Sequence, residues 1–169
     1  MNRGISPECI IQMSSFTHLI ITAPNKSIAN VYNNQLQSIR INNSALKDVA
    51  CSCVEDPHGL RVGSGGGTLN ALNKAIQKLD LMTIMSMRIL IIHSGGDSRR
   101  LPFHSITGKA WATLNSTVNN TYTSPMALLI EEMNLFCRNL CPGSMVVCCS
   151  DVMLDIWRVR INKSCVLEP

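Results

Sequence analysis

The feature that most constrains the fold of this chain is an apolar run of mostly branched residues that ends in glycines. The run spans residues 89–92 and leads through His93 to Ser94, Gly95 and Gly96. Short continuous runs of this kind are typical of strands buried on both faces of a parallel sheet. Glycines let the backbone turn sharply and come close to a ligand. The sequence therefore predicts a buried strand whose carboxyl end opens onto a binding loop.

Three cationic side chains follow this turn. Arg99 and Arg100 come directly after Ser98, and Lys109 lies seven residues beyond Pro102. Backbone N–H groups in a glycine turn, together with fixed cations, make a good site for polyphosphate. A plain strand-to-loop turn with solvated arginines has the same first few residues, so the inference depends on the spacing of the arginines, the proline and the lysine.

Strands and helices are expected to alternate along the chain. Apolar runs predict strands at residues 19–23, 48–54, 89–92 and 145–149. Apolar positions at three- and four-residue steps predict helices at residues 26–41, 68–81 and 125–140. This alternation is typical of an α/β domain with a mostly parallel sheet and helices on both faces. Ligands of such sheets bind beyond the carboxyl ends of the strands, where the glycine turn and Asp151 are both expected.

A second glycine-rich stretch precedes the helix expected at 68–81. Its glycines and the threonine that ends it are Gly63, Gly65, Gly66, Gly67 and Thr68. A helix that starts directly after glycines directs free N–H groups and the positive end of its dipole at whatever fills the loop. Glycines also let a helix pack closely against a strand, so the stretch indicates a phosphate or sugar contact only in combination with the first loop.

Charge and cysteine content exclude several classes of protein. The formal net charge is +4 and the basic residues are scattered, so nucleic acid is not an expected partner, whereas a small anionic substrate is. The chain has 8 cysteines but no Cys-x-x-Cys pair, which disfavours a zinc site. No apolar run is long enough to cross a bilayer, and no secretory signal is recognisable, so we expect no membrane partner and a cytoplasmic location.

The two loops together resemble those of the sugar-nucleotide pyrophosphorylases. Arg61 to Leu72 and His93 to Pro102 stand in the order found in the fucose-1-phosphate guanylyltransferase and L-fucokinase family, the family of the GDP-fucose pyrophosphorylase domain. The resemblance covers roughly residues 18–155. It implies a Rossmann-like nucleotidyltransferase fold that takes part in fucose salvage, transfers GMP from GTP to fucose 1-phosphate and releases pyrophosphate.

The resemblance also implies roles for particular residues. Arg99 and Lys109 are the expected catalytic cations, acting on the triphosphate and the sugar phosphate, and Asp151 is the expected ligand of Mg²⁺. The expected nucleotide-binding residues are Gly63, Gly65, Gly66, Gly67, Thr68, Ser94, Gly95, Gly96, Ser98, Arg99 and Arg100. Ordinary roles compete with these: Arg100 can form a surface ion pair, Asp151 can cap a helix, and His93 is more typical of a hydrogen-bonded core histidine than of a catalyst.

The chain divides into three parts. Residues 1–17 are expected to form an irregular N-terminal arm, 18–155 the N-terminal portion of a pyrophosphorylase-like domain, and 156–169 a divergent tail. The fold is therefore expected to be incomplete, and the C-terminal part of the same protein is a possible partner. This leaves two alternatives open: a non-catalytic remnant that binds nucleotide or a protein, and the N-terminal domain of an ATP-dependent L-fucokinase.

Overall fold

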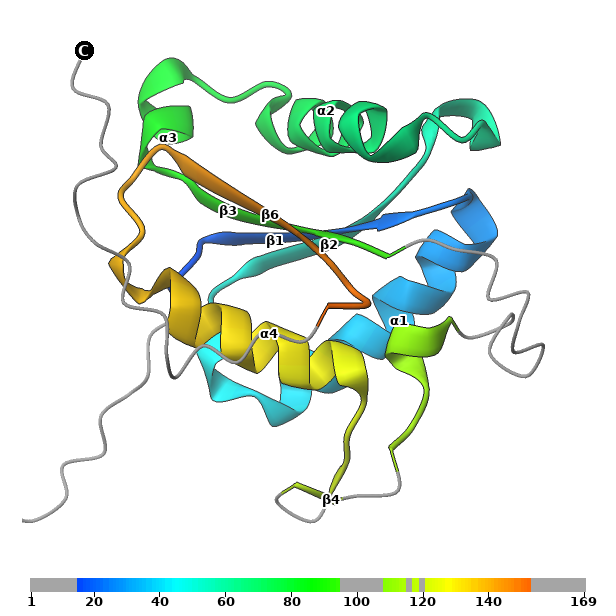
Figure 1. Cartoon of the computed structure of the whole chain (residues 1–169). Coiled ribbons are helices and arrows are strands. Elements are labelled where there is room, and N and C mark those ends of the chain that lie inside the picture. Colours follow the sequence, from blue (N-terminus) through cyan, green and yellow to red (C-terminus); the bar gives the residue numbers. More distant parts are fainter. Residues whose placement is uncertain (1–14, 95–107, 115–116, 119–120, 153–169) are drawn as a thin grey trace, which may run out of the picture.

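A parallel β-sheet forms the centre of the computed structural model, which describes residues 15–94, 108–114, 117–118 and 121–152 (Figure 1). Its strands are β1 (His18–Ala23), β2 (Ala50–Glu55), β3 (Arg88–His93) and β6 (Ser144–Cys149). They are hydrogen-bonded in the order β2-β1-β3-β6, and every neighbouring pair is parallel. The short strands β4 (Thr117–Val118) and β5 (Thr121–Tyr122) form a separate antiparallel pair. The expected α/β architecture is confirmed.

Helices cover both faces of the sheet. The α-helices are α1 (Lys26–Asn42), α2 (Gly63–Ile76), α3 (Leu81–Ser86) and α4 (Pro125–Phe136). The short 3-10 helices are η1 (Ser44–Leu46), η2 (Pro57–Gly59), η4 (Lys109–Trp111) and η5 (Cys137–Asn139). Figure 1 shows α1 and α4 on one side of the sheet, with α2 and α3 on the other. None of the helices in the described residues is long and apolar enough to cross a membrane.

The central strands β1 and β3 alternate their side chains between two cores. Leu19 and Leu90 pack in the core beneath α1 and α4, whereas Ile20 and Ile91 pack beneath α2. Burial of each such side chain contributes about 1.5–3 kcal/mol, so the two central strands are held firmly from both faces. This double burial explains why both strands have continuous apolar sequences.

The edge strand β6 is buried on one face only. Its residues Val146 and Cys148 pack against the core beneath α1 and α4. Met145 and Val147 point to the opposite face and are 41% and 43% exposed. Its backbone nevertheless pairs with β3 over the full strand, which places the carboxyl ends of the two strands side by side.

The structure corrects the prediction for the second glycine-rich stretch. The helix expected at 68–81 is α2, which begins at Gly63 and ends at Ile76, so the glycines form its first turns and do not form a loop before it. The expected end at residue 81 was also wrong, because Lys78 has a left-handed φ of 66° and Asp80 caps the new helix α3. Glycine disfavours the interior of a helix, but at the first turn this cost is small.

Two other boundaries differ from expectation. The helix expected at 125–140 ends at Phe136 and continues as η5, and the expected strand 48–54 is displaced to Ala50–Glu55. The first expected helix is correct to one residue, since α1 ends at Asn42 instead of residue 41. Its predicted cap is confirmed as well, because the Asn25 side chain accepts a hydrogen bond from the backbone N–H of Ile28 at 3.0 Å.

Candidate functional site

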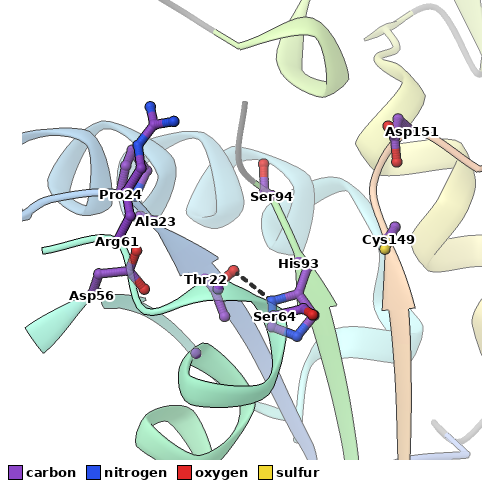
Figure 2. Close-up of a pocket in the computed structure, with 12 residues that line it drawn as sticks. Thr22, Ala23, Pro24, Asp56, Arg61, Ser64, His93, Ser94, Cys149 and Asp151 are labelled. Carbon is purple, nitrogen blue, oxygen red and sulfur yellow. Dashed lines mark hydrogen bonds between the residues drawn. The ribbon is translucent and has the colours of Figure 1, made fainter. Parts of the chain in front are cut away.

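A cavity of about 360 Å³ opens at the carboxyl ends of the sheet strands. Figure 2 shows its lining residues around the ends of β1, β3 and β6 and the start of α2. They are Thr22, Ala23, Pro24, Asp56, Arg61, Gly63, Ser64, Gly67, His93, Ser94, Cys149 and Asp151. The cavity lies where a parallel sheet is expected to bind its ligand.

His93 occupies the middle of this pocket and is held by two threonines. The Thr22 hydroxyl lies 3.1 Å from its Nδ1, and the Thr68 hydroxyl lies 2.8 Å from its Nε2. Burial lowers the pKa of His93, and the nearby charge of Asp56 only partly opposes this shift. His93 is therefore neutral at pH 7, with one ring nitrogen donating to a threonine and the other accepting from one.

Gly67 lies next to His93 and Asp56, and its lack of a side chain leaves room for both. A β-carbon at Gly67 would lie 3.4 Å from His93 Cε1 and 3.7 Å from an Asp56 carboxylate oxygen. A longer side chain would fill the gap between those two residues. The helix α2 thus approaches the pocket through a glycine, with Gly63 and Ser64 of its first turn also on the pocket wall. No side chain in the described part of the chain caps this helix start, so its first N–H groups are available to a ligand.

Ser94 links the pocket to the core. Its hydroxyl accepts a hydrogen bond from Trp111 Nε1 at 3.3 Å, and Trp111 stacks on Tyr32 with ring centroids 4.9 Å apart. Burial raises the pKa of Tyr32, and a side-chain hydrogen bond with Ser94 partly offsets this rise. Gly108 has a φ of 76°, and a β-carbon there would lie 2.8 Å from the Tyr32 hydroxyl oxygen, so a glycine is needed at this position.

Lys109 directly follows this glycine, at the start of η4. Its side chain is exposed, and it is not among the residues that line the pocket. Its neighbour Trp111 is tied to Ser94, which does line the pocket. The backbone that carries Lys109 is therefore anchored to the pocket wall by Trp111, two residues further along the chain.

Asp151 lies in the turn after β6 and lines the pocket on the side opposite to β2. The backbone N–H of Ser150 donates to the carbonyl of His93 at 2.9 Å, which extends the pairing of β3 and β6 beyond the strand ends. This bond places the Asp151 turn beside the start of the glycine turn at Ser94. Asp151 is exposed, and the alternative that it caps a following helix concerns residues after 152, outside the described part of the chain.

The remaining predicted site residues divide into two groups. Gly95, Gly96, Ser98, Arg99 and Arg100 lie in 95–107, outside the described residues. The other group belongs to α2, where Gly63 and Gly67 line the pocket and Thr68 reaches it through its bond with His93. Gly65 is exposed and Gly66 is half-buried, and neither lines the pocket.

The pocket residues that sequence reasoning did not assign to the site include Thr22, Asp56 and Arg61. Asp56 directly follows β2 just as Asp151 follows β6, so the rule that strand ends form the site also applied to it. Thr22 had no comparable signal, because it reads as one more β-branched residue of a buried strand. His93, weighed as a hydrogen-bonded core residue, is indeed hydrogen-bonded, but it also lines the pocket.

The two pocket carboxylates are too far apart to share one ion. Asp56 follows β2 and Asp151 follows β6, which are the opposite edges of the four-stranded sheet. Three strand spacings separate these edges by about 14 Å. Within the described residues no three His, Cys, Asp or Glu side chains gather into a metal site. A single carboxylate such as Asp151 suits Mg²⁺, which takes one or two protein carboxylates together with substrate phosphates and waters.

The parallel sheet, the pocket at its strand ends and the glycine-rich first turn of α2 define an α/β domain of Rossmann-like nucleotidyltransferase type. The family model described as the fucose pyrophosphorylase domain matches residues 82–167. The chain belongs to this family. The match runs through residues 156–167, a segment that the sequence alone assigned to a tail.

Three curated relatives support this assignment. Human fucose-1-phosphate guanylyltransferase is 34% identical over 134 residues, which are 79% of this chain and 22% of the relative. The mouse protein of the same name is 34% identical over 101 residues, covering 59% of this chain and 16% of the relative. A bifunctional fucokinase/GDP-fucose pyrophosphorylase of Arabidopsis thaliana is 27% identical over 134 residues, covering 68% of this chain and 13% of the relative. No solved structure matches the chain significantly.

The buried, neutral state of His93 predicts a pH dependence of stability. Its pKa in the folded protein lies below the ordinary value of 6.5. As the pH falls below about 6.5, the unfolded chain takes up a proton at this position while the folded chain does not, so stability falls. His93→Gln is expected to flatten the decrease in melting temperature between pH 7 and pH 5.

The matched control is His58→Asn, because His58 is exposed and asparagine tolerates its left-handed φ of 54°. Burial also lowers the pKa of His18, and this contribution remains in both variants. The measured quantity is the slope of melting temperature against pH. An equal slope in wild type and His93→Gln would show that His93 is not held neutral by the fold.

Proposed function

We propose that this pocket binds GTP and a sugar 1-phosphate, fucose 1-phosphate, and that the chain carries the guanylyl-transfer site of a GDP-fucose pyrophosphorylase. The observation that carries the proposal is the pairing of β3 with β6, because it brings Ser94, at the start of the signature turn, and Asp151 to one pocket. The family match adds the reaction class, since the relatives are named for guanylyl transfer and pyrophosphorolysis.

The chemistry requires neutralisation of phosphate charge. A phosphate oxygen of the sugar 1-phosphate attacks the α-phosphorus of GTP and forms the new P–O bond of the GDP-sugar. The bond from the α-phosphorus to the oxygen that bridges the α- and β-phosphates breaks, and pyrophosphate leaves. Arg99 and Arg100 provide guanidinium groups that fork onto phosphate oxygens, and Lys109 provides a point charge. The start of α2 lies on the pocket wall and offers N–H donors to polar groups of the ligand.

Asp151 is the proposed protein ligand for Mg²⁺. Its carboxylate faces the pocket with no hydrogen bond or ion pair to another described residue. When bound, Mg²⁺ supplies charge neutralisation on the phosphate oxygens, which lowers the cost of forming the charged transition state. The part assigned to this chain is to hold that ion next to the Ser94 turn.

We also propose a cytoplasmic location, and the thiols support it. Cys51, Cys53, Cys137, Cys141, Cys148 and Cys149 are all free. Burial raises the pKa of Cys53 and of Cys148 to about 12, so both stay protonated and unreactive. A protein with several free thiols suits a reducing compartment.

Release of pyrophosphate tests the proposed reaction. Pyrophosphate is measured after GTP, Mg²⁺ and fucose 1-phosphate are added to the chain, with ATP in place of GTP and with the sugar phosphate left out as controls. Release that needs both GTP and fucose 1-phosphate supports guanylyl transfer. Binding of GTP without any release would support the alternative of a domain that binds nucleotide but does not transfer it.

Lys109→Ala is expected to weaken GTP binding by about 10- to 150-fold, because loss of a charge-assisted contact costs about 1.5–3 kcal/mol. Lys47→Ala is the control, since Lys47 is exposed next to η1, near the amino end of β2. Arg40 is unsuitable as a control because its guanidinium donates to the carbonyls of Leu46 and Lys47. GTP affinity is measured by calorimetry. An equal loss of affinity in both lysine variants would show that the effect comes from non-specific electrostatic attraction.

A further inference from the structure

We propose that Asp56 recognises the guanine base of the nucleotide. The inference rests on the proposed function, because it assigns the base of GTP to the β1–β2 side of the same pocket. Asp56 directly follows β2 and lines the pocket, whereas Asp151 lines it from the far edge of the sheet. Figure 2 shows Asp56 and Asp151 on opposite sides of His93.

The backbone fixes the position of Asp56. Its N–H donates to the carbonyl of Ala23 at 2.9 Å, and its carbonyl accepts from the N–H of Gly59 at 3.1 Å. These bonds tie the residue to the end of β1 and to η2. Its carboxylate has no hydrogen bond or ion pair with any other described residue, although it lines the pocket half-buried. A fixed, partly desolvated acceptor that has no partner among the described residues is suited to a ligand that carries hydrogen-bond donors.

Guanine presents such donors in a matching pair. Its N1–H and N2–H groups are adjacent and parallel, so one carboxylate accepts both, as it does from an arginine fork. Adenine has an acceptor at N1 and no amino group at C2, so a carboxylate there repels it. The neighbouring Ala23, Pro24 and Gly67 add small or apolar surface against which a flat ring fits.

Other roles for this carboxylate fit less well. A phosphate group next to Asp56 would be repelled by a like charge. An ion shared with Asp151 is excluded by the separation of about 14 Å between the sheet edges. His93 lies close to Asp56, but burial lowers its pKa and keeps it neutral, so it does not form an ion pair with the Asp56 carboxylate. The phosphates are instead assigned to the opposite half of the pocket, near Ser94 and Asp151.

The separation of the two sheet edges suits a nucleotide that lies across the strand ends. With its phosphates near Asp151, an extended nucleotide directs its base along the pocket past His93 and toward β2. Asp56 is then placed to select the base, and Asp151 is placed to act near the reacting phosphate. The two residues follow equivalent ends of parallel strands but serve different parts of one ligand.

The test changes the hydrogen-bonding groups of both the base and residue 56. Xanthine has a carbonyl at C2 where guanine has an amino group, so it matches an asparagine amide and mismatches a carboxylate. Equilibrium dissociation constants for GTP, inosine triphosphate, xanthosine triphosphate and ATP are measured with this chain, with Asp56→Asn and with Asp48→Asn. Asp48 is an exposed aspartate just before the amino end of the same strand, so its variant is the matched control.

Wild type is expected to bind GTP at least about tenfold more tightly than xanthosine triphosphate or ATP, with inosine triphosphate between them. Asp56→Asn is expected to weaken GTP by at least about tenfold and to bind xanthosine triphosphate more tightly than wild type does. Asp48→Asn should leave all constants unchanged. Thermal melting of the variants checks that both remain folded.

Three results would overturn the assignment, and they separate it from the proposed function. If Asp56→Asn weakened the binding of all four nucleotides equally, the carboxylate would contact the ribose or the phosphates, which they share, and not the base. An unchanged GTP constant, with a weaker response to fucose 1-phosphate in the pyrophosphate assay, would place Asp56 on the sugar and leave the proposed function standing. No binding of any nucleotide by wild type would remove the proposed function, and the base assignment with it.

Discussion

Trp111→Ala is expected to lower the free energy of unfolding by about 3–5 kcal/mol, the range typical of a buried aromatic replaced by alanine. Trp111 is only 4% exposed, so the change leaves a cavity in the core beneath α1 and α4. It also removes the stack on Tyr32 and the hydrogen bond to Ser94. Urea denaturation followed by circular dichroism measures the loss.

Trp111→Phe separates packing from hydrogen bonding. Phenylalanine keeps an aromatic ring next to Tyr32 but cannot donate to Ser94, so a smaller decrease in the free energy of unfolding is expected. The lost hydrogen bond accounts for about 0.5–1.5 kcal/mol, and the smaller ring adds a modest cost for the cavity it leaves. Because Ser94 lines the pocket, both variants should also weaken GTP binding. A loss below about 1 kcal/mol in Trp111→Ala would mean that the ring is not part of the core.

Asp151→Asn is expected to abolish the Mg²⁺ dependence of GTP binding and most of the guanylyl transfer. Asparagine keeps the shape of the side chain but removes the charge that a hard cation requires. Loss of a group that merely supports a metal ligand costs roughly 10- to 100-fold, so loss of the ligand itself should cost at least as much. The melting temperature should hardly change, because Asp151 is exposed. Calorimetric titration of GTP with and without Mg²⁺ measures the effect.

Asp80→Asn is the control for this experiment. Asp80 caps α3 by accepting from the N–H of Thr83 at 2.9 Å, and asparagine caps helices about as well as aspartate. Neither its stability nor its metal dependence should move. If Asp151→Asn behaved in the same way, with normal Mg²⁺-dependent turnover, Asp151 would be removed from the site, and the metal would need another ligand.

The fold was predictable from sequence wherever strands are buried on both faces. β1 and β3 have continuous apolar sequences because α1, α4 and α2 cover them, and this signal is strong and local. α2 was predicted less well because its start depends on contacts that the local sequence does not show. Gly67 lies beside His93, a residue 26 positions later in the chain, and this proximity is not visible in the local sequence.

The candidate site was predictable only in part. Glycine turns and strand-end carboxylates mark Ser94 and Asp151, and both line the pocket. Thr22 joins them only through the pairing of β1 with β3, which is a matter of topology that composition and spacing do not reveal, whereas Asp56 had the same strand-end signal as Asp151. Lys109 shows the opposite limit: its spacing from the glycine turn predicts a role at the site, whereas its side chain on η4 is exposed and is not among the residues that line the pocket.

The two threonines that hold His93 have a stereochemical consequence for the proposed reaction. Both ring nitrogens already have hydroxyl partners, so neither has a free lone pair with which to attack phosphorus. For the proposed guanylyl transfer we therefore expect no phosphoramidate on His93, and a single in-line displacement from GTP to the sugar phosphate. One displacement inverts the configuration at a chiral α-phosphorus, whereas transit through a histidine would invert it twice and retain it.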